Sequence, residues 1–91
     1  MSIQVRIPSL LRRQTGGEEI VALEGATLSE VLDGLETRFQ GLKGKLRGPQ
    51  GEIRRFVNIY LNDNDVRMLA GPTTPVTDGD EVTIIPAVAG G

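Results

Sequence analysis

Apolar and polar residues alternate near both ends of the chain and in its middle, a spacing typical of strands that bury one face. Five strands are predicted, at residues 3–7, 18–23, 55–62, 66–68 and 81–85. The first two form a hairpin with a long connection through residues 10–14. Pro8 and Pro86 end the first and last strands, because a proline has no N–H to donate to a sheet.

The spacing of the apolar residues changes to a helical period between the second and third strands. It predicts one helix over residues 27–40, which begins with a capping box between Thr27 and Glu30. One face of this helix is apolar and carries Leu28, Val31, Leu32, Leu35 and Phe39. A further helical turn is predicted after it, anchored by Leu42 and Leu46.

A helix and a sheet with one apolar face each predict a two-layer α+β domain over residues 1–86. The helix is expected to meet the apolar side of the sheet, which carries Ile3, Val5, Ile7, Val57, Ile59, Val82 and Ile84. No element is predicted after Pro86, so residues 87–91 are expected to form a flexible tail.

The composition argues against an enzyme. The chain has 91 residues with no cysteine and no histidine, which excludes a thiolate nucleophile, a histidine base and the commonest zinc ligands. Its net charge is −2 with both signs interspersed, so nucleic-acid binding is not favoured. The sequence contains neither a membrane-spanning apolar run nor a signal peptide, and we expect a cytoplasmic protein.

The candidate chemical site is the end of the chain. The residues before the last one are small and uncharged: Ala87, Val88, Ala89 and Gly90. From Pro86 onward the segment reaches roughly 20 Å when extended, enough to thread through a tunnel into a partner's active site. The reacting group is then the α-carboxylate of Gly91. Attack on ATP would convert it to an acyl-adenylate, and sulfur would then replace AMP to leave a thiocarboxylate.

This order of elements, together with the Gly-Gly end, resembles the β-grasp fold of ubiquitin-like proteins. The Asp78-Gly79-Asp80 turn and the Pro-Ala-Val-Ala-Gly-Gly end are similar to the superfamily of the molybdopterin synthase small subunit and the thiamine sulfur carrier. The sequence resembles more closely the thiocarboxylate sulfur carrier of cysteine biosynthesis. That resemblance covers the whole chain and rests on Ile7-Pro8, Leu11-Arg12, Thr15-Gly16-Gly17, Arg55 to Asp63, Asp65-Val66-Arg67 and the end.

The resemblance implies a β-grasp domain with a mixed sheet of four to five strands packed on one main helix. It also implies a sulfur carrier whose Gly91 is adenylated by an E1-like ATP-dependent adenylyltransferase and sulfurtransferase. In the cysteine branch, a pyridoxal-phosphate cysteine synthase then takes the sulfur, and a zinc metallopeptidase releases cysteine. Both cofactors would belong to partners, so none is expected for this chain.

Three alternatives stay open from the sequence. The chain could be the small subunit of molybdopterin synthase, a ubiquitin-like modifier joined to lysines, or a β-grasp binding module with an inert tail. The modifier is disfavoured because no arginine precedes the glycines, as one does in ubiquitin.

Surface residues supply further candidates. Docking of partners is predicted at Phe56, Tyr60 and Ile85, because the two aromatic residues lie on the strand face opposite the core face. A basic stretch is interpreted as a solvated loop and consists of Lys43, Lys45, Arg47, Arg54 and Arg55. Four acidic residues are interpreted as turn formers and not as metal ligands: Asp63, Asp65, Asp78 and Asp80.

Overall fold

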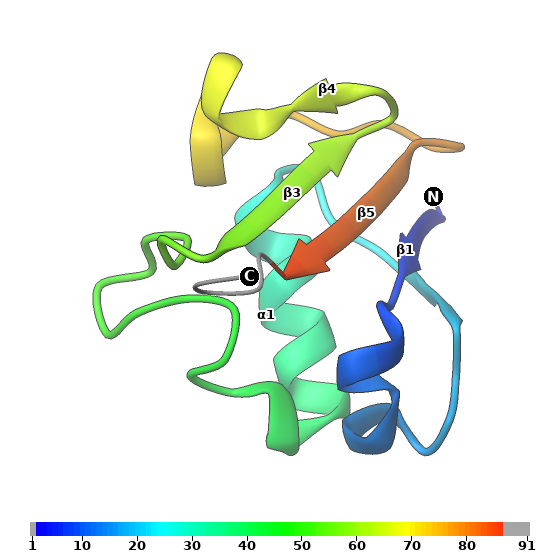
Figure 1. Cartoon of the computed structure of the whole chain (residues 1–91). Helices are drawn as coiled ribbons and strands as arrows, with labels where there is room; N and C mark the ends of the chain where they lie inside the picture. The colour runs from blue at the N-terminus through cyan, green and yellow to red at the C-terminus, as the bar shows by residue number, and fades with distance from the viewer. Residues whose placement is uncertain (1, 87–91) are drawn as a thin grey trace.

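The computed structural model describes residues 2–86, and the predicted tail at 87–91 lies outside the described residues. One α-helix, α1 (Leu28–Arg38), packs on a five-stranded sheet (Figure 1). The strands are β1 (Ile3–Arg6), β2 (Ile20–Leu23), β3 (Val57–Leu61), β4 (Asn64–Asp65) and β5 (Glu81–Pro86). Four short 3-10 helices lie between them: η1 (Ser9–Thr15), η2 (Gln40–Leu42), η3 (Val66–Met68) and η4 (Gly71–Thr73).

The sheet is mixed, and its order is β2-β1-β5-β3-β4. The central strands β1 and β5 are parallel, whereas every other neighbouring pair is antiparallel. The chain therefore passes from the β1–β2 hairpin through α1 to β3, and returns to the middle of the sheet with its last strand. This arrangement confirms the predicted two-layer α+β architecture.

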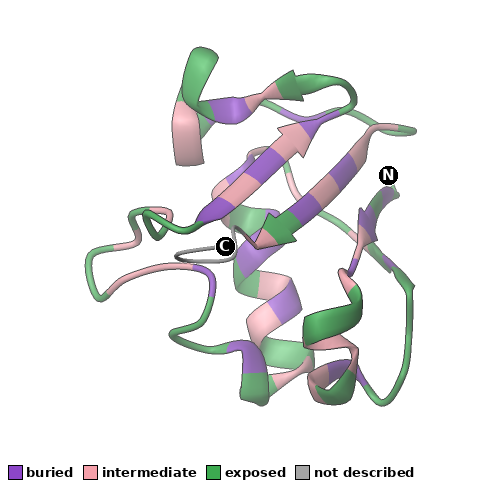
Figure 2. Cartoon of the chain, in the orientation of Figure 1, coloured by how far each residue is buried: buried purple, intermediate pink, exposed green. Residues whose placement is uncertain are grey.

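The core lies between α1 and one face of the sheet (Figure 2). The predicted helix residues Leu28, Val31, Leu32 and Leu35 are fully buried. All seven predicted sheet residues are buried as well. Phe39 is only partly buried, because α1 ends at Arg38 and Phe39 is already its C-cap. Leu42 and Leu46 are buried as predicted, although the regular turn near them covers only residues 40–42.

The capping residues of α1 act as the sequence predicts. Thr27 has an extended backbone, and its hydroxyl accepts the N–H of Glu30 at 3.3 Å. The Glu30 carboxylate in turn accepts the N–H of Ala26 at 3.0 Å, one residue earlier than the usual capping box. These bonds satisfy donors that the first helical turn leaves without partners.

One predicted element is wrong. The predicted strand at 66–68 is the 3-10 helix η3, because the Asp65 carboxylate accepts the N–H of Arg67 and starts a helical turn. The short strand that follows β3 and pairs with it is β4, which comes before residues 66–68 in the sequence. A tight turn in which Asn62 has a φ of 55° joins the two strands. The hairpin of β1 and β2 with its long connection is confirmed, and η1 lies within that connection.

Two of the carboxylates predicted to form turns, those of Asp78 and Asp80, accept backbone hydrogen bonds at the turn before β5. Asp78 accepts the N–H of Ser2 at 2.6 Å, which joins the turn before β5 to the start of β1. Asp80 accepts the N–H of Thr77 at 2.8 Å, and this hydrogen bond lowers the pKa of the Asp80 carboxyl below its ordinary value. Within residues 2–86, no group of three or more acidic side chains is placed to hold a metal ion.

Candidate functional site

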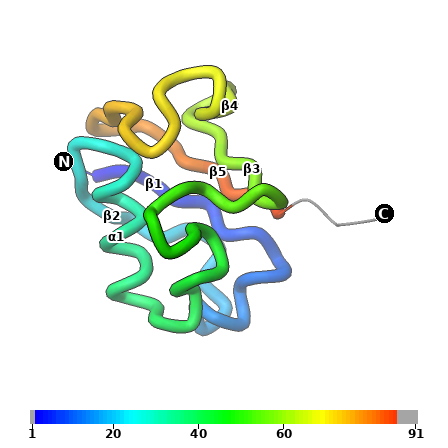
Figure 3. The backbone as a smooth tube through the Cα atoms, turned by 90° about the vertical axis from the view of Figure 1, so that its left-hand side faces the viewer, coloured from blue at the N-terminus to red at the C-terminus, as the bar shows by residue number. Residues whose placement is uncertain are grey.

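The tail leaves the domain at the end of β5. In the register of the sheet, Pro86 lies opposite Val57, the first residue of β3. The end of β5 and the start of β3 therefore lie side by side, next to the loop that precedes β3 (Figure 3). The candidate reactive residue Gly91 and the threading residues Ala87, Val88, Ala89 and Gly90 lie outside the described residues.

The side chain of Arg67 holds the start of β3, on the edge that β4 does not reach. β4 pairs with β3 only at Tyr60 and Leu61. Beyond that point Arg67 covers the edge: its Nη2 donates to the carbonyl of Val57 at 2.6 Å and to that of Arg54 at 2.9 Å. Its Nη1 donates to Asn58 Oδ1 at 2.8 Å. Arg67 thereby fixes the strand end against which Pro86 lies, a role that the sequence analysis did not assign.

The outer face of the sheet brings two of the three predicted docking residues together. Asn58 pairs with Ile85 and Tyr60 with Thr83, so Tyr60 and Ile85 are diagonal neighbours on this face. Both also line one shallow cavity. Ile85 is 46% exposed, whereas Tyr60 is half-buried. Such an apolar pair beside the root of the tail can contact a protein that receives the tail.

Phe56 does not belong to that pair. It precedes β3, which begins at Val57 and not at residue 55 as predicted. Its ring is 55% exposed and lines a separate cavity, together with basic residues of the loop before β3. The grouping of Phe56 with Tyr60 and Ile85 on one strand face is therefore wrong, although Phe56 is exposed as expected.

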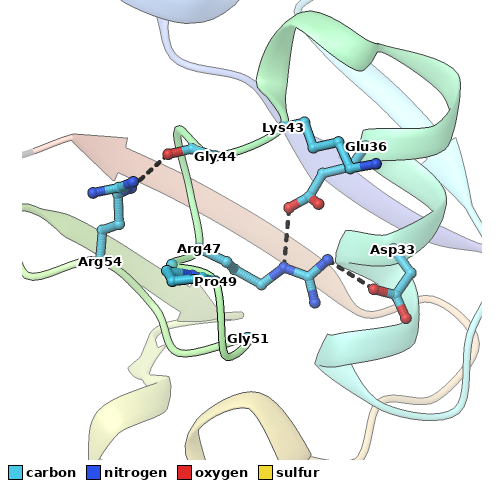
Figure 4. Close-up of a pocket in the computed structure, with 9 residues that line it drawn as sticks. Asp33, Glu36, Lys43, Gly44, Arg47, Pro49, Gly51 and Arg54 are labelled. Atoms are coloured by element: carbon cyan, nitrogen blue, oxygen red, sulfur yellow. Dashed lines mark hydrogen bonds and ion pairs between the residues drawn. The ribbon is translucent and has the colours of Figure 1, made fainter.

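The basic stretch is not a uniform solvated loop. The side chain of Arg47 is only 10% exposed and connects the loop to α1 (Figure 4). Its Nε donates to Glu36 Oε2 at 3.0 Å, and its Nη2 donates to Asp33 Oδ1 at 2.7 Å. The hydrogen bond to Glu36 contributes most to raising the pKa of Arg47, and burial opposes it. Asp33 and Glu36 offset two of the three positive charges that line the cavity of about 580 Å³ around this cluster, those of Lys43, Arg47 and Arg54.

A second cavity of about 700 Å³ lies at the start of β3, next to the root of the tail. Four basic residues line it: Lys45, Arg54, Arg55 and Arg67. Its one acidic lining residue is Glu52, whose carboxylate accepts the N–H of Gln50. The surface around the root of the tail is therefore cationic, in contrast to the chain as a whole.

A family comparison supplies the identity that this geometry leaves open. Residues 5–91, which include the Gly-Gly end, match the model of the ThiS family. The chain belongs to the ThiS family. It is 48% identical to the sulfur carrier protein CysO of Mycobacterium tuberculosis, with both chains covered completely. It is also 36% identical to the small archaeal modifier protein 3 of Haloferax volcanii, again over the whole of both chains.

A solved structure of a relative extends this likeness to three dimensions. In the crystal structure of the Amycolatopsis orientalis BexX/CysO complex, the similar chain is 47% identical and superposes with a TM-score of 0.91. The match covers 98% of this chain and 99% of that one. The β-grasp fold predicted for this ThiS family member is confirmed, as are the prediction of a sulfur carrier and the prediction that the chain is not an enzyme. Among residues 2–86, no helix is long and apolar enough to span a membrane.

Proposed function

We propose that this chain carries sulfur as a thiocarboxylate on Gly91 and donates it for the biosynthesis of cysteine. The full-length identity with a CysO sulfur carrier is the observation that carries this proposal. The family match that runs through Gly91 supports it. So does the position of Pro86 at the end of a central strand, five residues before Gly91.

The reaction that we propose begins at the α-carboxylate of Gly91. An oxygen of this carboxylate attacks the α-phosphorus of ATP, and pyrophosphate leaves. Hydrosulfide attacks the acyl carbon, and AMP leaves with the oxygen. Where a persulfide attacks instead, an acyl disulfide forms, and a thiol then cleaves its S–S bond to leave the thiocarboxylate and a disulfide. The thiocarboxylate sulfur can afterwards attack an electrophilic carbon on a second partner. The protein itself supplies the carboxylate and its placement, because it has no histidine or cysteine for acid–base or thiol chemistry.

The partners follow from this chemistry and are part of the proposal. They are an E1-like ATP-dependent adenylyltransferase and sulfurtransferase, a pyridoxal-phosphate cysteine synthase and a zinc metallopeptidase. The relative from Amycolatopsis orientalis has been crystallised in a complex named BexX/CysO, which supports the idea that such carriers work bound to other proteins. The division into a domain at 1–86 and a flexible tail at 87–91 remains a prediction.

Intact mass of the protein purified from its native host tests the proposed function. We expect a fraction of the molecules to be heavier by the difference between one sulfur and one oxygen atom, with the change located in the C-terminal peptide. The same protein made in a host without the activating enzyme is the control, and it should show the unmodified mass only. An isopeptide bond between Gly91 and a lysine of another protein, without any thiocarboxylate, would instead favour the modifier function suggested by the archaeal relative.

We further propose that partners dock on the outer sheet face at Tyr60 and Ile85. Placing a charge there by Ile85→Asp should raise the KM for the carrier in adenylation by on the order of 10-fold, about 1.4 kcal/mol of binding. Ile20→Asp is a matched control: Ile20 is 44% exposed, and it lies on the edge strand β2, which β1 separates from β5. If both variants were impaired equally, or neither were, this docking face would be wrong.

A further inference from the structure

Charged residues of opposite sign lie at the two ends of β3 and β5. β3 runs from the basic cavity at Val57 toward the turn at residues 62–63, and β5 runs back from the turn at 77–80 to Pro86. The two turns meet at that far end, where Asn62 donates to Asp80 Oδ1 at 3.3 Å. The end of the sheet from which the tail leaves is thus opposite the end that carries these turns.

The end that carries the tail has an uncompensated positive charge. Lys45 and Arg55 are exposed, and within residues 2–86 their side chains make no hydrogen bond or ion pair. Arg54 and Arg67 do have partners, but these are uncharged oxygens: Arg54 donates to the carbonyl of Gly44, and Arg67 donates to carbonyl and amide oxygens. The exposed ring of Phe56 lies among these four cations.

The opposite end is acidic. Its two turns contain Asp63, Asp78 and Asp80 and no lysine or arginine. Asp80 and Asp78 accept hydrogen bonds from backbone N–H groups and neutral side chains, which leave their negative charge in place. The five residues of β3 separate the two ends by roughly 16 Å at about 3.3 Å per residue. Because screening in physiological salt acts over about 8 Å, a partner at the tail end is influenced mainly by the cations.

We propose that this cationic surface, formed by Lys45, Arg54, Arg55 and Arg67 around Phe56, docks on an acidic surface of the adenylating enzyme. This inference rests on the proposed function, since it places the acidic surface around the entrance that receives the tail. Opposite charges at the two ends orient the carrier during diffusion, so that the tail approaches the enzyme first. Electrostatic complementarity of this kind raises the association rate more than it raises final affinity.

The test measures adenylation by ATP–pyrophosphate exchange with the activating enzyme of the same organism. In the variant K45E/R55E, we expect kcat/KM for the carrier to fall on the order of 10-fold or more at low salt, with kcat at saturating carrier unchanged. The difference from the wild type should shrink at about 0.5 M salt, where screening is strong. The neutral variant K45Q/R55Q should show an intermediate loss. Thermal unfolding should be unchanged, because neither side chain has a partner within the described chain.

Lys43→Glu is the matched control, because it makes the same kind of charge reversal two residues away from Lys45. Lys43 lines the other cavity, where Asp33 and Glu36 offset most of the positive charge, so K43E should lose much less activity per charge reversed. Exchange with K45E/R55E as fast as with the wild type at low salt would overturn the docking surface alone. Exchange that is absent with the wild-type protein would overturn the proposed function and this surface with it.

Discussion

Replacing Leu35 by alanine is expected to lower the free energy of unfolding by about 2–5 kcal/mol, the usual range for a buried leucine. Leu35 lies in the last part of α1, and its side chain is fully buried in the core between helix and sheet. The substitution removes apolar surface and leaves a cavity that the close-packed neighbours cannot fill completely. A domain of this size is stable by only about 5–14 kcal/mol, so the loss is a large part of the total.

Chemical denaturation followed by circular dichroism measures this loss. Leu10→Ala is the matched control, because the same atoms are removed from a side chain that is 69% exposed. That variant should stay within about 0.5 kcal/mol of the wild type. A midpoint for Leu35→Ala that barely moved would mean that the apolar face of α1 does not carry the core.

The layers of the fold could be predicted because the buried positions recur in the sequence at the period of a helix or of a strand. Leu28, Val31, Leu32 and Leu35 recur at the helical period, and all four are buried. Val57 and Ile59 alternate with polar residues, and they face the core as expected. These patterns are local, so a single chain is enough to read them. The mixed character of the sheet was implied by the resemblance and not by the periods, and the order of its strands was not predicted.

The failures concern residues whose conformation depends on short polar contacts. At 66–68 the alternation of apolar and polar residues was weak, and a single hydrogen bond from the N–H of Arg67 to Asp65 favours a 3-10 turn. The segment 9–15 contains no helical period long enough to detect, yet it forms η1. Propensities over three to seven residues are too small to decide between such states.

The basic residues show why the site was harder to predict than the fold. Lys43 to Arg55 form one group along the sequence, but their environments differ. The side chain of Arg47 is largely covered and pairs with Glu36, whereas Lys45 and Arg55 are exposed beside the root of the tail. One signal was present: Asp33 and Glu36 lie three residues apart and therefore share one side of the helix, where a distant cation can pair with both. The identity of the basic residue that pairs with Asp33 and Glu36 depends on the path of the loop before β3, which local patterns do not give.

Deleting Gly91 is expected to abolish adenylation while the domain keeps its stability. The reacting atom is the carbonyl carbon of the last residue, so truncation moves the terminal carboxylate back by roughly 3.5 Å. A misplacement of about 1 Å can already cost on the order of a hundredfold in rate. Gly91→Phe should be equally inactive, because a large side chain would enter a space that a glycine leaves empty. The measurement is ATP–pyrophosphate exchange with the cognate activating enzyme.

A measurement of stability distinguishes loss of the reacting group from loss of the folded domain. The buried core ends at Ile84, and β5 ends at Pro86, so neither change at Gly91 removes a contact of the described domain. Thermal unfolding midpoints should equal that of the wild type, in contrast to Leu35→Ala.

Gly91→Ala adds only one methyl group and keeps the carboxylate in register, so it should retain more activity than the deletion. If the truncated protein were adenylated at the normal rate, the terminal carboxylate would not be the reacting group. A binding module with an inert tail would then explain the sequence better.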